Sequence, residues 1–258
     1  IGGILSNNSS GMVCGTEFNS YHTIDSLSFI LPNGNSYDTS KSDENQKFIK
    51  REKEITETLK SIQETIKTNP ELKRKVRDKY RIKNTIGYSM NAFLDFEKPL
   101  DIFSHLLIGS EGTLAFISSC IMNTVPNPEY FGTGLFIFND SKAAGSTISQ
   151  FKDLGASAIE FLDDKSLKTA RHYKNIPYDT NLIDDNDVGI LIEYQNDDIN
   201  NILSFLKKTK QSLKKNRSIK STLLVTNDKK REAIWKIRKG LYPTIGALRE
   251  DSKSVITE

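Results

Sequence analysis

The chain has 258 residues, 36% of them hydrophobic and 27% charged, a composition ordinary for a globular protein of one large or two medium domains. Its formal net charge of +3 is small and its basic residues lie among acidic ones, which argues against a nucleic-acid partner. No apolar run reaches the roughly 20 residues of a transmembrane helix, and two isolated cysteines, Cys14 and Cys120, exclude a disulfide framework or a local metal site and favour a cytoplasmic protein.

The N-terminal segment, Ile1-Gly-Gly-Ile-Leu-Ser-Asn-Asn-Ser-Ser-Gly-Met12, combines glycines with small and amide side chains. Such a backbone can lie against a large flat ligand, because few bulky side chains obstruct it. The chain starts inside this glycine motif and stops at Val255-Ile-Thr-Glu258, within a pattern typical of a strand. We therefore expect the sequence to be an internal fragment of a longer protein.

A β-hairpin is predicted over residues 25–37, where two apolar runs flank Pro32-Asn-Gly-Asn35. The pair Asn33-Gly34 is expected to supply both positive-φ positions of a tight turn. The hairpin would form one side of a small sheet.

Residues 41–80 are predicted to form a helical insertion into that sheet domain. Apolar residues from Phe48 to Ile66 recur at helical spacing among lysines and glutamates, which predicts one amphipathic helix. Asn69-Pro70 then suits the cap and the first position of a second helix. The basic side of this insertion is either a solvated face or a surface for a partner.

The most informative stretch is Gly109-Ser-Glu-Gly112, between a short helix predicted at Pro99–Leu107 and a strand predicted at Leu114–Val125. Glycine accepts positive φ and carries no side chain to obstruct a ligand, and a carboxylate between two glycines is well placed to accept hydrogen bonds. The turn is therefore either a ligand contact or an ordinary β-turn with a solvated glutamate. Pro126-Asn-Pro128 ends the strand pattern and marks a domain boundary.

The second half of the chain alternates strands and helices. The predicted elements are a strand at 135–138, a helix at 141–154, a strand at 158–162, a helix at about 164–172, a strand at 188–194, a helix at 199–213, a strand at 222–225 and a helix at 228–242. With the helix at 164–172 set aside, the order is β-α-β-β-α-β, which predicts an antiparallel sheet with its helices on one face. The open face is expected to cover a ligand held by the first domain.

On the last predicted helix, Arg231, Trp235, Arg238 and Tyr242 are spaced so that they share one face. This face is suited to gripping a planar carboxylate, since a guanidinium can donate two parallel hydrogen bonds. In the alternative, Trp235 packs in the core and its arginines extend to water. The three histidines form no set with a nucleophile, so the sequence assigns no catalytic or metal-binding residue.

Taken together, the motifs resemble those of FAD-linked oxidoreductases of the vanillyl-alcohol oxidase and p-cresol methylhydroxylase superfamily. Within it, the sequence is most similar to D-lactate and D-2-hydroxyglutarate dehydrogenases that continue into an iron–sulfur region. The motifs, in order, are Gly2-Gly3 with Asn8, Gly11 and Gly15, Leu31-Pro-Asn-Gly34, Lys83-Asn-Thr-Ile-Gly-Tyr88, Gly109-Ser-Glu-Gly-Thr-Leu114 and Trp235-Lys-Ile-Arg238. The likeness covers nearly the whole chain.

This resemblance implies an α+β protein. Residues 1–128 would form the second half of an FAD-binding domain, a mixed sheet with helices and the insertion at about 41–80. Residues 129–258 would form a ferredoxin-like antiparallel cap domain that binds substrate and is truncated at its C-terminus. The glycine-rich pyrophosphate loop is expected upstream, and the catalytic histidines and any cysteine clusters downstream.

The resemblance also implies FAD as cofactor and allows an iron–sulfur cluster downstream of this sequence. The implied partners are a 2-hydroxy acid as substrate and a separate electron acceptor. The longer protein is expected to be cytoplasmic, which is compatible with peripheral membrane association. The residues expected to contact FAD are Gly2, Gly3, Asn8, Ser9, Gly11, Gly15, Glu111, Gly112 and Ile117. Arg238 matches the arginine that binds the carboxylate of a D-2-hydroxy acid, and Tyr242 aligns with a threonine that contacts substrate. The isolated chain is expected to be inactive.

The sequence departs from this family pattern at three positions. Ala115 stands where many relatives have glycine, Tyr242 replaces the threonine, and Thr257 stands where hydroxyglutarate dehydrogenases place a substrate-binding lysine. The alternatives are another FAD-linked oxidase, such as a glycolate oxidase or an ether-lipid synthase, and a noncatalytic ligand-binding or assembly module.

Overall fold

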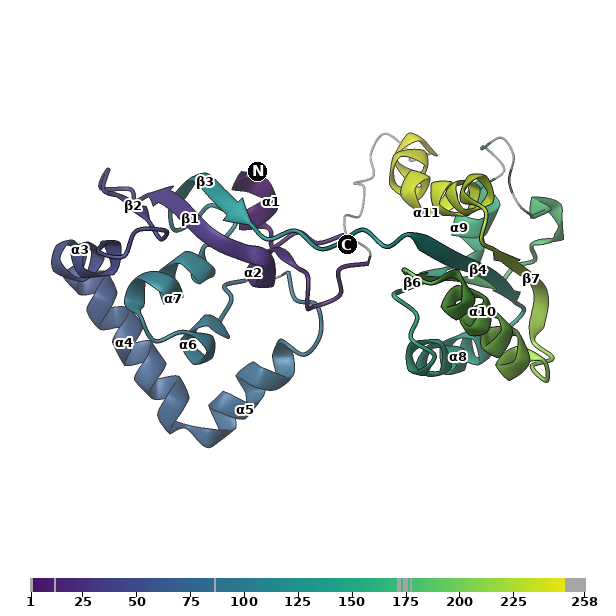
Figure 1. Cartoon of the computed structure of the whole chain (residues 1–258), viewed down its shortest axis with the longest axis horizontal. Coiled ribbons are helices and arrows are strands. Elements are labelled where there is room, and N and C mark those ends of the chain that lie inside the picture. Colours follow the sequence, from purple (N-terminus) through teal and green to yellow (C-terminus); the bar gives the residue numbers. More distant parts are fainter. Residues whose placement is uncertain are drawn as a thin grey trace. The chain divides into compact units, whose positions relative to one another are not determined.

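The computed structural model describes residues 2–11, 13–85, 87–170, 173, 176 and 178–248, apart from the side chains of 242, 245, 247 and 248. The chain divides into two compact units, Ile1–Pro126 and Asn127–Glu258 (Figure 1). Each unit buries its own hydrophobic core. Each is described by itself below.

The sheet of the first unit has three antiparallel strands in the order β2-β1-β3. They are β1 (Ile24–Ile30), β2 (Ser36–Asp38) and β3 (Phe116–Met122), so β3 is shorter than the predicted strand. The hairpin between β1 and β2 confirms the prediction, but its turn differs. Of the two turn residues only Gly34 has positive φ, at 85°, because the loop is closed by Leu31 N donating to Asn35 O at 2.9 Å rather than by a two-residue turn.

Helices pack against this sheet and build most of the first core. The longer ones are α3 (Glu44–Arg51), α4 (Lys53–Thr68), α5 (Pro70–Lys79) and α7 (Pro99–Leu106), and the short ones are α1 (Gly2–Ser6), α2 (Ser20–Thr23) and α6 (Ala92–Asp95). The predicted start of α5 is confirmed, since the side chain of Asn69 accepts a hydrogen bond from Leu72 N and Pro70 occupies the first turn.

The prediction of one unbroken helix through Phe48 and Ile66 was wrong, because Glu52 interrupts it with φ −110° and ψ 60°. The side chain of Glu52 is only 6% exposed. Its carboxylate accepts hydrogen bonds from Tyr37 Oη at 2.6 Å, Asn35 Nδ2 at 2.7 Å and Asn33 Nδ2 at 3.1 Å. A buried carboxylate needs such donors, so the break in the helix places Glu52 under the hairpin loop.

Glu52→Ala is expected to lower the free energy of unfolding of the first unit by about 1–3 kcal/mol, because the buried Tyr37 hydroxyl and the two asparagine amides lose their shared acceptor. Hydrogen–deuterium exchange of peptides from β1 and α4 would measure the loss. Glu54, which is exposed on the same helix, provides the control Glu54→Ala. Equal protection in both variants would contradict this role.

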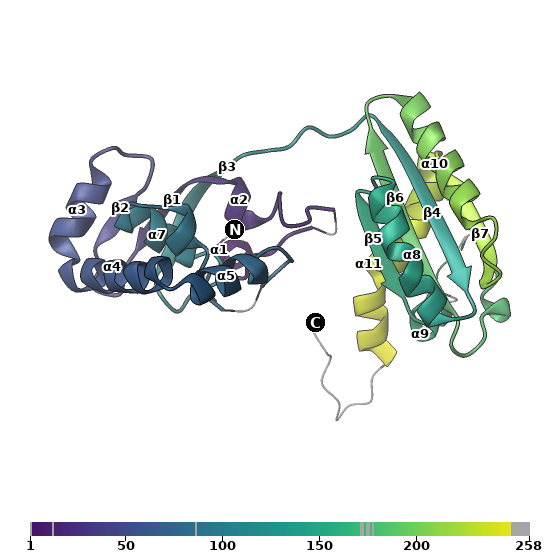
Figure 2. The same ribbon diagram turned by 90° about the horizontal axis from the view of Figure 1, so that it is seen from below.

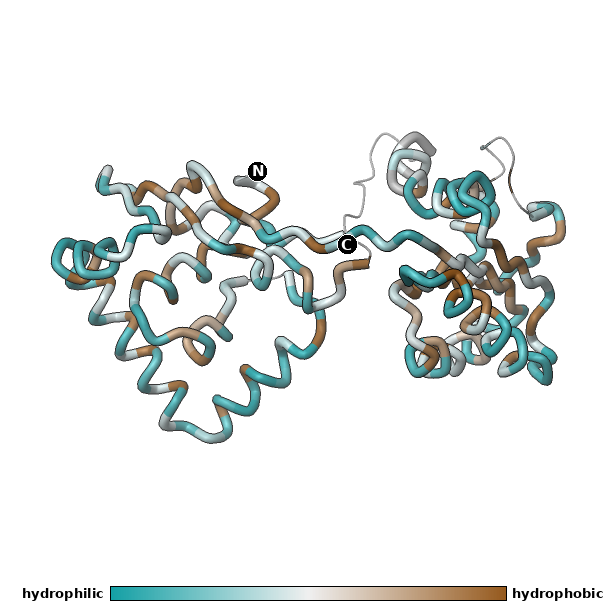
Figure 3. The backbone as a smooth tube through the Cα atoms, viewed as in Figure 1, coloured by the Kyte–Doolittle hydropathy of each residue, from teal (hydrophilic) through white to brown (hydrophobic). Residues whose placement is uncertain are grey.

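The sheet of the second unit has four antiparallel strands in the order β5-β6-β4-β7. The strands are β4 (Tyr130–Phe138), β5 (Ala158–Leu162), β6 (Val188–Asn196) and β7 (Ile219–Val225). Helices α8 (Ser141–Asp153) and α10 (Ile199–Leu213) follow β4 and β6 and cover one face. This is the predicted ferredoxin-like arrangement, with amphipathic helices packed on a hydrophobic sheet (Figure 3).

The other face of this sheet is not open, so the prediction of an open face that covers a ligand was wrong. Helices α9 (Asp164–Thr169) and α11 (Asp228–Leu248) contact strands of the sheet from the side opposite to α8 and α10 (Figure 2). A short 3-10 helix, Thr180–Leu182, lies beside α9. Buried Leu167, Ile234 and Leu241 explain the cover, because both helices carry an apolar side of their own.

Candidate functional site

The two glycine segments of the first unit lie side by side. Leu5 O accepts a hydrogen bond from Gly109 N at 3.1 Å, and Ser6 O accepts one from Glu111 N at 3.0 Å. Two main-chain hydrogen bonds therefore join the last turn of α1 to the Gly109-Ser-Glu-Gly112 turn. Segments about 100 residues apart in the sequence meet here through main-chain groups.

The turn itself has an unusual backbone. Gly109, Glu111 and Gly112 all have positive φ, at 90°, 54° and 74°. A Cβ on Gly109 would lie 3.2 Å from Gly87 O, whereas one on Gly112 would meet nothing within 4 Å. Glu111 and Gly112 are exposed, so the turn projects its acid and its second glycine outward.

Gly3 lies on an open surface of the first unit. It is exposed in α1 without a positive φ, and a Cβ there would meet no atom within 4 Å. Nothing in the described part of the first unit therefore requires glycine at position 3. Gly2 differs, because its Cβ would lie 3.4 Å from Ile117 O and the helix packs closely on β3 at that point.

Asn8 supports this surface from inside. It is 6% exposed with φ 47°, its Oδ1 accepts from Tyr21 N at 3.2 Å, and its Nδ2 donates to Asn84 O at 3.3 Å. Its backbone N donates to Leu5 O at 2.9 Å, so both the side chain and the main chain of Asn8 are bonded within the protein and hold the turn after α1 in place. Ser9 is exposed, and its carbonyl accepts from Ser20 Oγ at 2.7 Å.

The remaining predicted cofactor residues differ in position. Gly11 and Gly15 lie in the exposed loop after α1, and in the described structure no hydrogen bond joins them to the Gly109 turn. Ile117 packs its side chain into the core at 8% exposure, so that side chain does not face a ligand. Exposed apolar side chains near Ile117 are instead those of Phe116 on β3 at 69% and Ile4 on α1 at 55%, which the sequence motifs did not single out. The alternation of Phe116 with buried Ala115 and Ile117 was the available signal.

Gly109→Ala is expected to lower the unfolding free energy of the first unit by about 1–3 kcal/mol, since alanine disfavours the left-handed region and its Cβ would crowd Gly87 O. Gly112→Ala has the same kind of backbone cost without the crowding. Exchange protection of peptides containing Leu5 in the two variants would separate these effects. A Gly109→Ala protein no less protected than Gly112→Ala would refute the close approach.

A cavity of about 640 Å³ opens beside the turn, lined mainly by apolar side chains that include Leu59, Ile62 and Leu114. Tyr88 and Thr113 border it and share a hydrogen bond of 2.9 Å between their hydroxyls. The cavity offers an apolar wall but no paired acid and base, so we assign it no chemistry.

In the second unit, Arg231 and Trp235 bind a planar carboxylate, which is the side chain of Glu193 and not an external ligand. Glu193 on β6 is fully buried and accepts from Arg231 Nε at 2.7 Å, Arg231 Nη2 at 3.0 Å and Trp235 Nε1 at 2.5 Å. Thr133 Oγ1 and Gln195 Nε2 also donate to it, both at 3.1 Å. Arg231 therefore pairs with a carboxylate of the protein and not with the predicted external one, although its side chain is 27% exposed, and Trp235 is buried as in the alternative prediction.

The protonation of Glu193 follows from these contacts. Burial alone raises the pKa of its carboxyl, but hydrogen bonds from Arg231, Trp235 and Gln195 and the charge of Arg231 outweigh burial and hold that pKa below its usual value. Glu193 is therefore an anion paired with Arg231, and this pair fixes α11 to the sheet.

Arg238 lies two turns further along α11 and is held differently. Its Nε donates to Glu160 Oε2 at 2.7 Å, with the arginine side chain 36% exposed and the glutamate 16%. Among the described residues, its two terminal nitrogens have no hydrogen-bond partner. The side chain of Tyr242 and all of Thr257 lie outside the described residues, so their predicted roles stay predictions.

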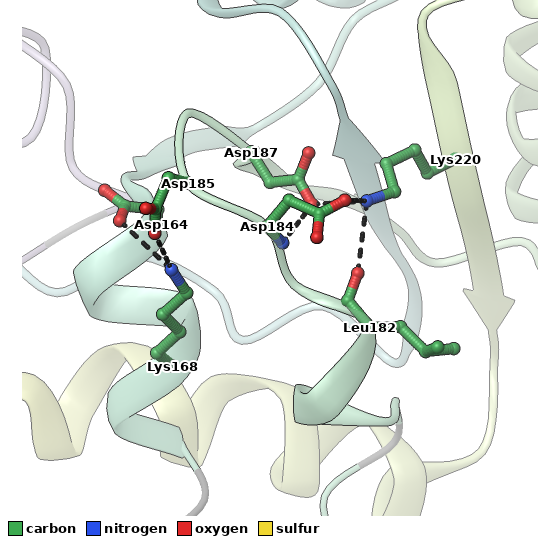
Figure 4. Close-up of polar contacts among 7 residues, drawn as sticks. All are labelled: Asp164, Lys168, Leu182, Asp184, Asp185, Asp187 and Lys220. Atoms are coloured by element: carbon green, nitrogen blue, oxygen red, sulfur yellow. Dashed lines mark hydrogen bonds and ion pairs between the residues drawn. The ribbon is translucent and has the colours of Figure 1, made fainter.

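Lysines neutralise the acidic loop before β6 (Figure 4). Lys220 Nζ donates to Asp184 at 2.7 Å, to Asp187 at 2.6 Å and to Leu182 O at 3.1 Å, and Lys168 Nζ lies 2.5 Å from Asp185. These contacts tie the loop to β7 and α9 and are structural. In the described ranges no group of three histidine, cysteine or acidic side chains could hold a metal ion, and no helix there has the length and apolarity needed to cross a membrane.

Comparison with known proteins places these features in context. The family model described as FAD linked oxidases, C-terminal domain, matches residues 127–258. A 75-residue segment is 33% identical to the glycolate oxidase subunit GlcD of Bacillus subtilis (strain 168), covering 28% of this chain and 16% of that protein.

Two solved structures of alkyldihydroxyacetonephosphate synthase, in crystal forms P1 and P212121, share the fold. They superpose with TM-scores of 0.54 and 0.51 over 95% of this chain, at 14% and 15% identity. The chain spans 36% of the length of each. At this identity the likeness concerns the fold alone.

Proposed function

Because the chain belongs to the FAD linked oxidases, whose C-terminal domain matches residues 127–258, we propose that it is part of a dehydrogenase that oxidises a D-2-hydroxy acid of the D-lactate or D-2-hydroxyglutarate type. FAD, when bound, would supply the redox chemistry by accepting a hydride from the carbinol carbon of the substrate. The electrons would pass to a separate acceptor, through an iron–sulfur region if the longer protein has one.

The first unit offers residues that fit a large cofactor. Gly3, Ser9 and Gly112 are exposed along the joined α1 and Gly109 turn, and Gly3 is a glycine that the described packing does not require. Exposed glycine main chain can approach a flat ligand closely, whereas Ser9 would offer only its side chain, because its N–H donates to Ile4 O and its carbonyl accepts from Ser20 Oγ. The carboxylate of Glu111 could accept hydrogen bonds from hydroxyl groups of the cofactor. In the amide orientation that satisfies its neighbours, Asn7 Nδ2 donates to Glu111 Oε2 at 2.8 Å and shares this carboxylate.

The observation that carries the substrate assignment is the guanidinium of Arg238. It is anchored through Nε and keeps its terminal nitrogens unpaired within the described structure, so it can bind a carboxylate in a bidentate manner. Arg231 cannot do this, because Glu193 already occupies it. The replacement of lysine by Thr257 leaves the second carboxylate of hydroxyglutarate without its matching partner, which favours D-lactate of the two.

The test uses the FAD-loaded longer protein and a panel of 2-hydroxy acids with an artificial electron acceptor. Oxidation of D-lactate or D-2-hydroxyglutarate, with bleaching of the flavin absorbance, is the expected result. Activity toward none of the panel would refute the proposal. A longer protein that purifies colourless would instead favour a noncatalytic binding or assembly module.

A second candidate is a glycolate oxidase type of activity, favoured by the 33% identity to the glycolate oxidase subunit GlcD. Glycolate carries a carboxylate and a hydroxyl on the same skeleton as D-lactate but lacks the methyl group. The same panel separates the two, since a glycolate enzyme would prefer glycolate over D-lactate. An ether-lipid synthase would oxidise neither.

A further inference from the structure

We propose that Glu160 is a positioning residue that holds the guanidinium of Arg238 by its Nε and so presents its two terminal nitrogens to the substrate carboxylate. This inference rests on the function proposed above. It concerns a residue that the sequence motifs did not single out, 78 positions before Arg238.

The position of Glu160 suits this task. It lies on β5, paired in register with Leu191 of β6, on the face of the sheet that α11 covers. β5 is the edge strand of the sheet, held by its main-chain pairing with β6, and the Glu160 side chain is only 16% exposed. The carboxylate of Glu160 therefore moves little, and its 2.7 Å hydrogen bond to Nε limits the motion of the Arg238 guanidinium.

The two arginines of α11 show why the arrangement leaves room for a ligand. A guanidinium has one edge formed by Nε with one terminal nitrogen and another formed by both terminal nitrogens. Glu193 fills the first edge of Arg231, taking Nε and Nη2 with both carboxylate oxygens. Glu160 takes only Nε of Arg238, so the second edge stays available for a carboxylate.

Two effects of Glu160 on an anionic substrate oppose each other. Its negative charge repels the substrate carboxylate, whereas its hydrogen bond removes the need to immobilise a long side chain during binding. Replacement by glutamine separates the effects, because the amide oxygen can still accept from Nε but carries no charge. Replacement by alanine removes both.

The experiment measures kcat and KM in the FAD-loaded longer protein, for D-lactate or D-2-hydroxyglutarate, whichever the wild type oxidises. In Glu160→Ala, KM is expected to rise about fivefold to tenfold, as for freeing one long side chain at a binding site, while kcat changes little. In Glu160→Gln, KM is expected to equal the wild-type value or to fall. Oxalate, a nonreacting dicarboxylate, should show the same order of affinities when its binding is followed by the change that it causes in the flavin absorbance.

A purely structural role predicts other results. The control Asp164→Ala removes an ion pair of the same unit, with Lys168 at 3.6 Å, and should leave KM unchanged. An unchanged KM in Glu160→Ala, or an equal rise in Glu160→Ala and Glu160→Gln, would overturn the positioning role while the proposed function stands. A wild-type protein that oxidises no 2-hydroxy acid would overturn both.

Discussion

Arg238→Ala is expected to lower kcat/KM for the 2-hydroxy acid by about 30-fold to 1,000-fold, because the substrate loses a charge-assisted, bidentate partner worth about 2–4 kcal/mol. The loss should appear mainly at limiting substrate. Arg238→Lys should recover only part of it, since an ammonium keeps the charge but not the planar fork. Steady-state kinetics of the FAD-loaded protein would measure both variants.

The same substitution also frees Glu160, which is 16% exposed, so stability must be measured beside activity. Unfolding followed by Trp235 fluorescence would show whether the second unit remains folded at the assay temperature. Arg217→Ala provides a control, because Arg217 is an exposed arginine of the same unit. If kcat/KM stays at the wild-type value in a folded Arg238→Ala protein, Arg238 does not bind the substrate.

Glu193→Ala is expected to destabilise the second unit by about 3–5 kcal/mol, as for breaking a buried ion pair by removing one partner. Arg231 would keep a charge without its carboxylate, and the buried Trp235 Nε1 would lose its acceptor. The change also removes the contact that joins α11 to β6. Urea unfolding monitored by Trp235 fluorescence would report this unit directly.

The difference between wild type and Glu193→Ala should depend on pH. The pKa of Glu193 is lower in the folded protein than in the unfolded chain, so its stabilising contribution is complete above the unfolded carboxyl pKa. It is lost as the pH falls through the folded-state pKa, and the two urea midpoints should converge in acid. Glu232→Ala, on the exposed side of α11, should shift the midpoint little at any of these pH values. Equal midpoints for Glu193→Ala and wild type at neutral pH would show that the buried pair adds no stability.

The elements that the sequence predicted well are those whose signals are local. Asn69-Pro70 started α5 as expected, and the strands and helices of the second unit follow their predicted order. Apolar spacing records which side of an element is buried, and caps and glycines record where it ends, so these features need no distant partner.

The errors came from contacts between distant residues. The helix break at Glu52 depends on donors in the β1–β2 hairpin, 15 to 19 residues earlier. The cover over the second sheet depends on α9 and α11 folding back onto strands far from them in sequence. The apolar periodicity of α9 and α11 predicts that each helix has a buried side, but it does not predict which strand that side contacts.

The sequence by itself determined the glycine segments, the order of the elements and the presence of an arginine and tryptophan face on the last helix. Only the tertiary structure decided that Glu193 occupies Arg231 while Glu160 leaves one edge of Arg238 available. Charge pairing is decided by which carboxylates the sheet register and the helix docking bring within hydrogen-bond distance. These partners are 38 and 78 residues away, so the folded chain selects them and local patterns cannot.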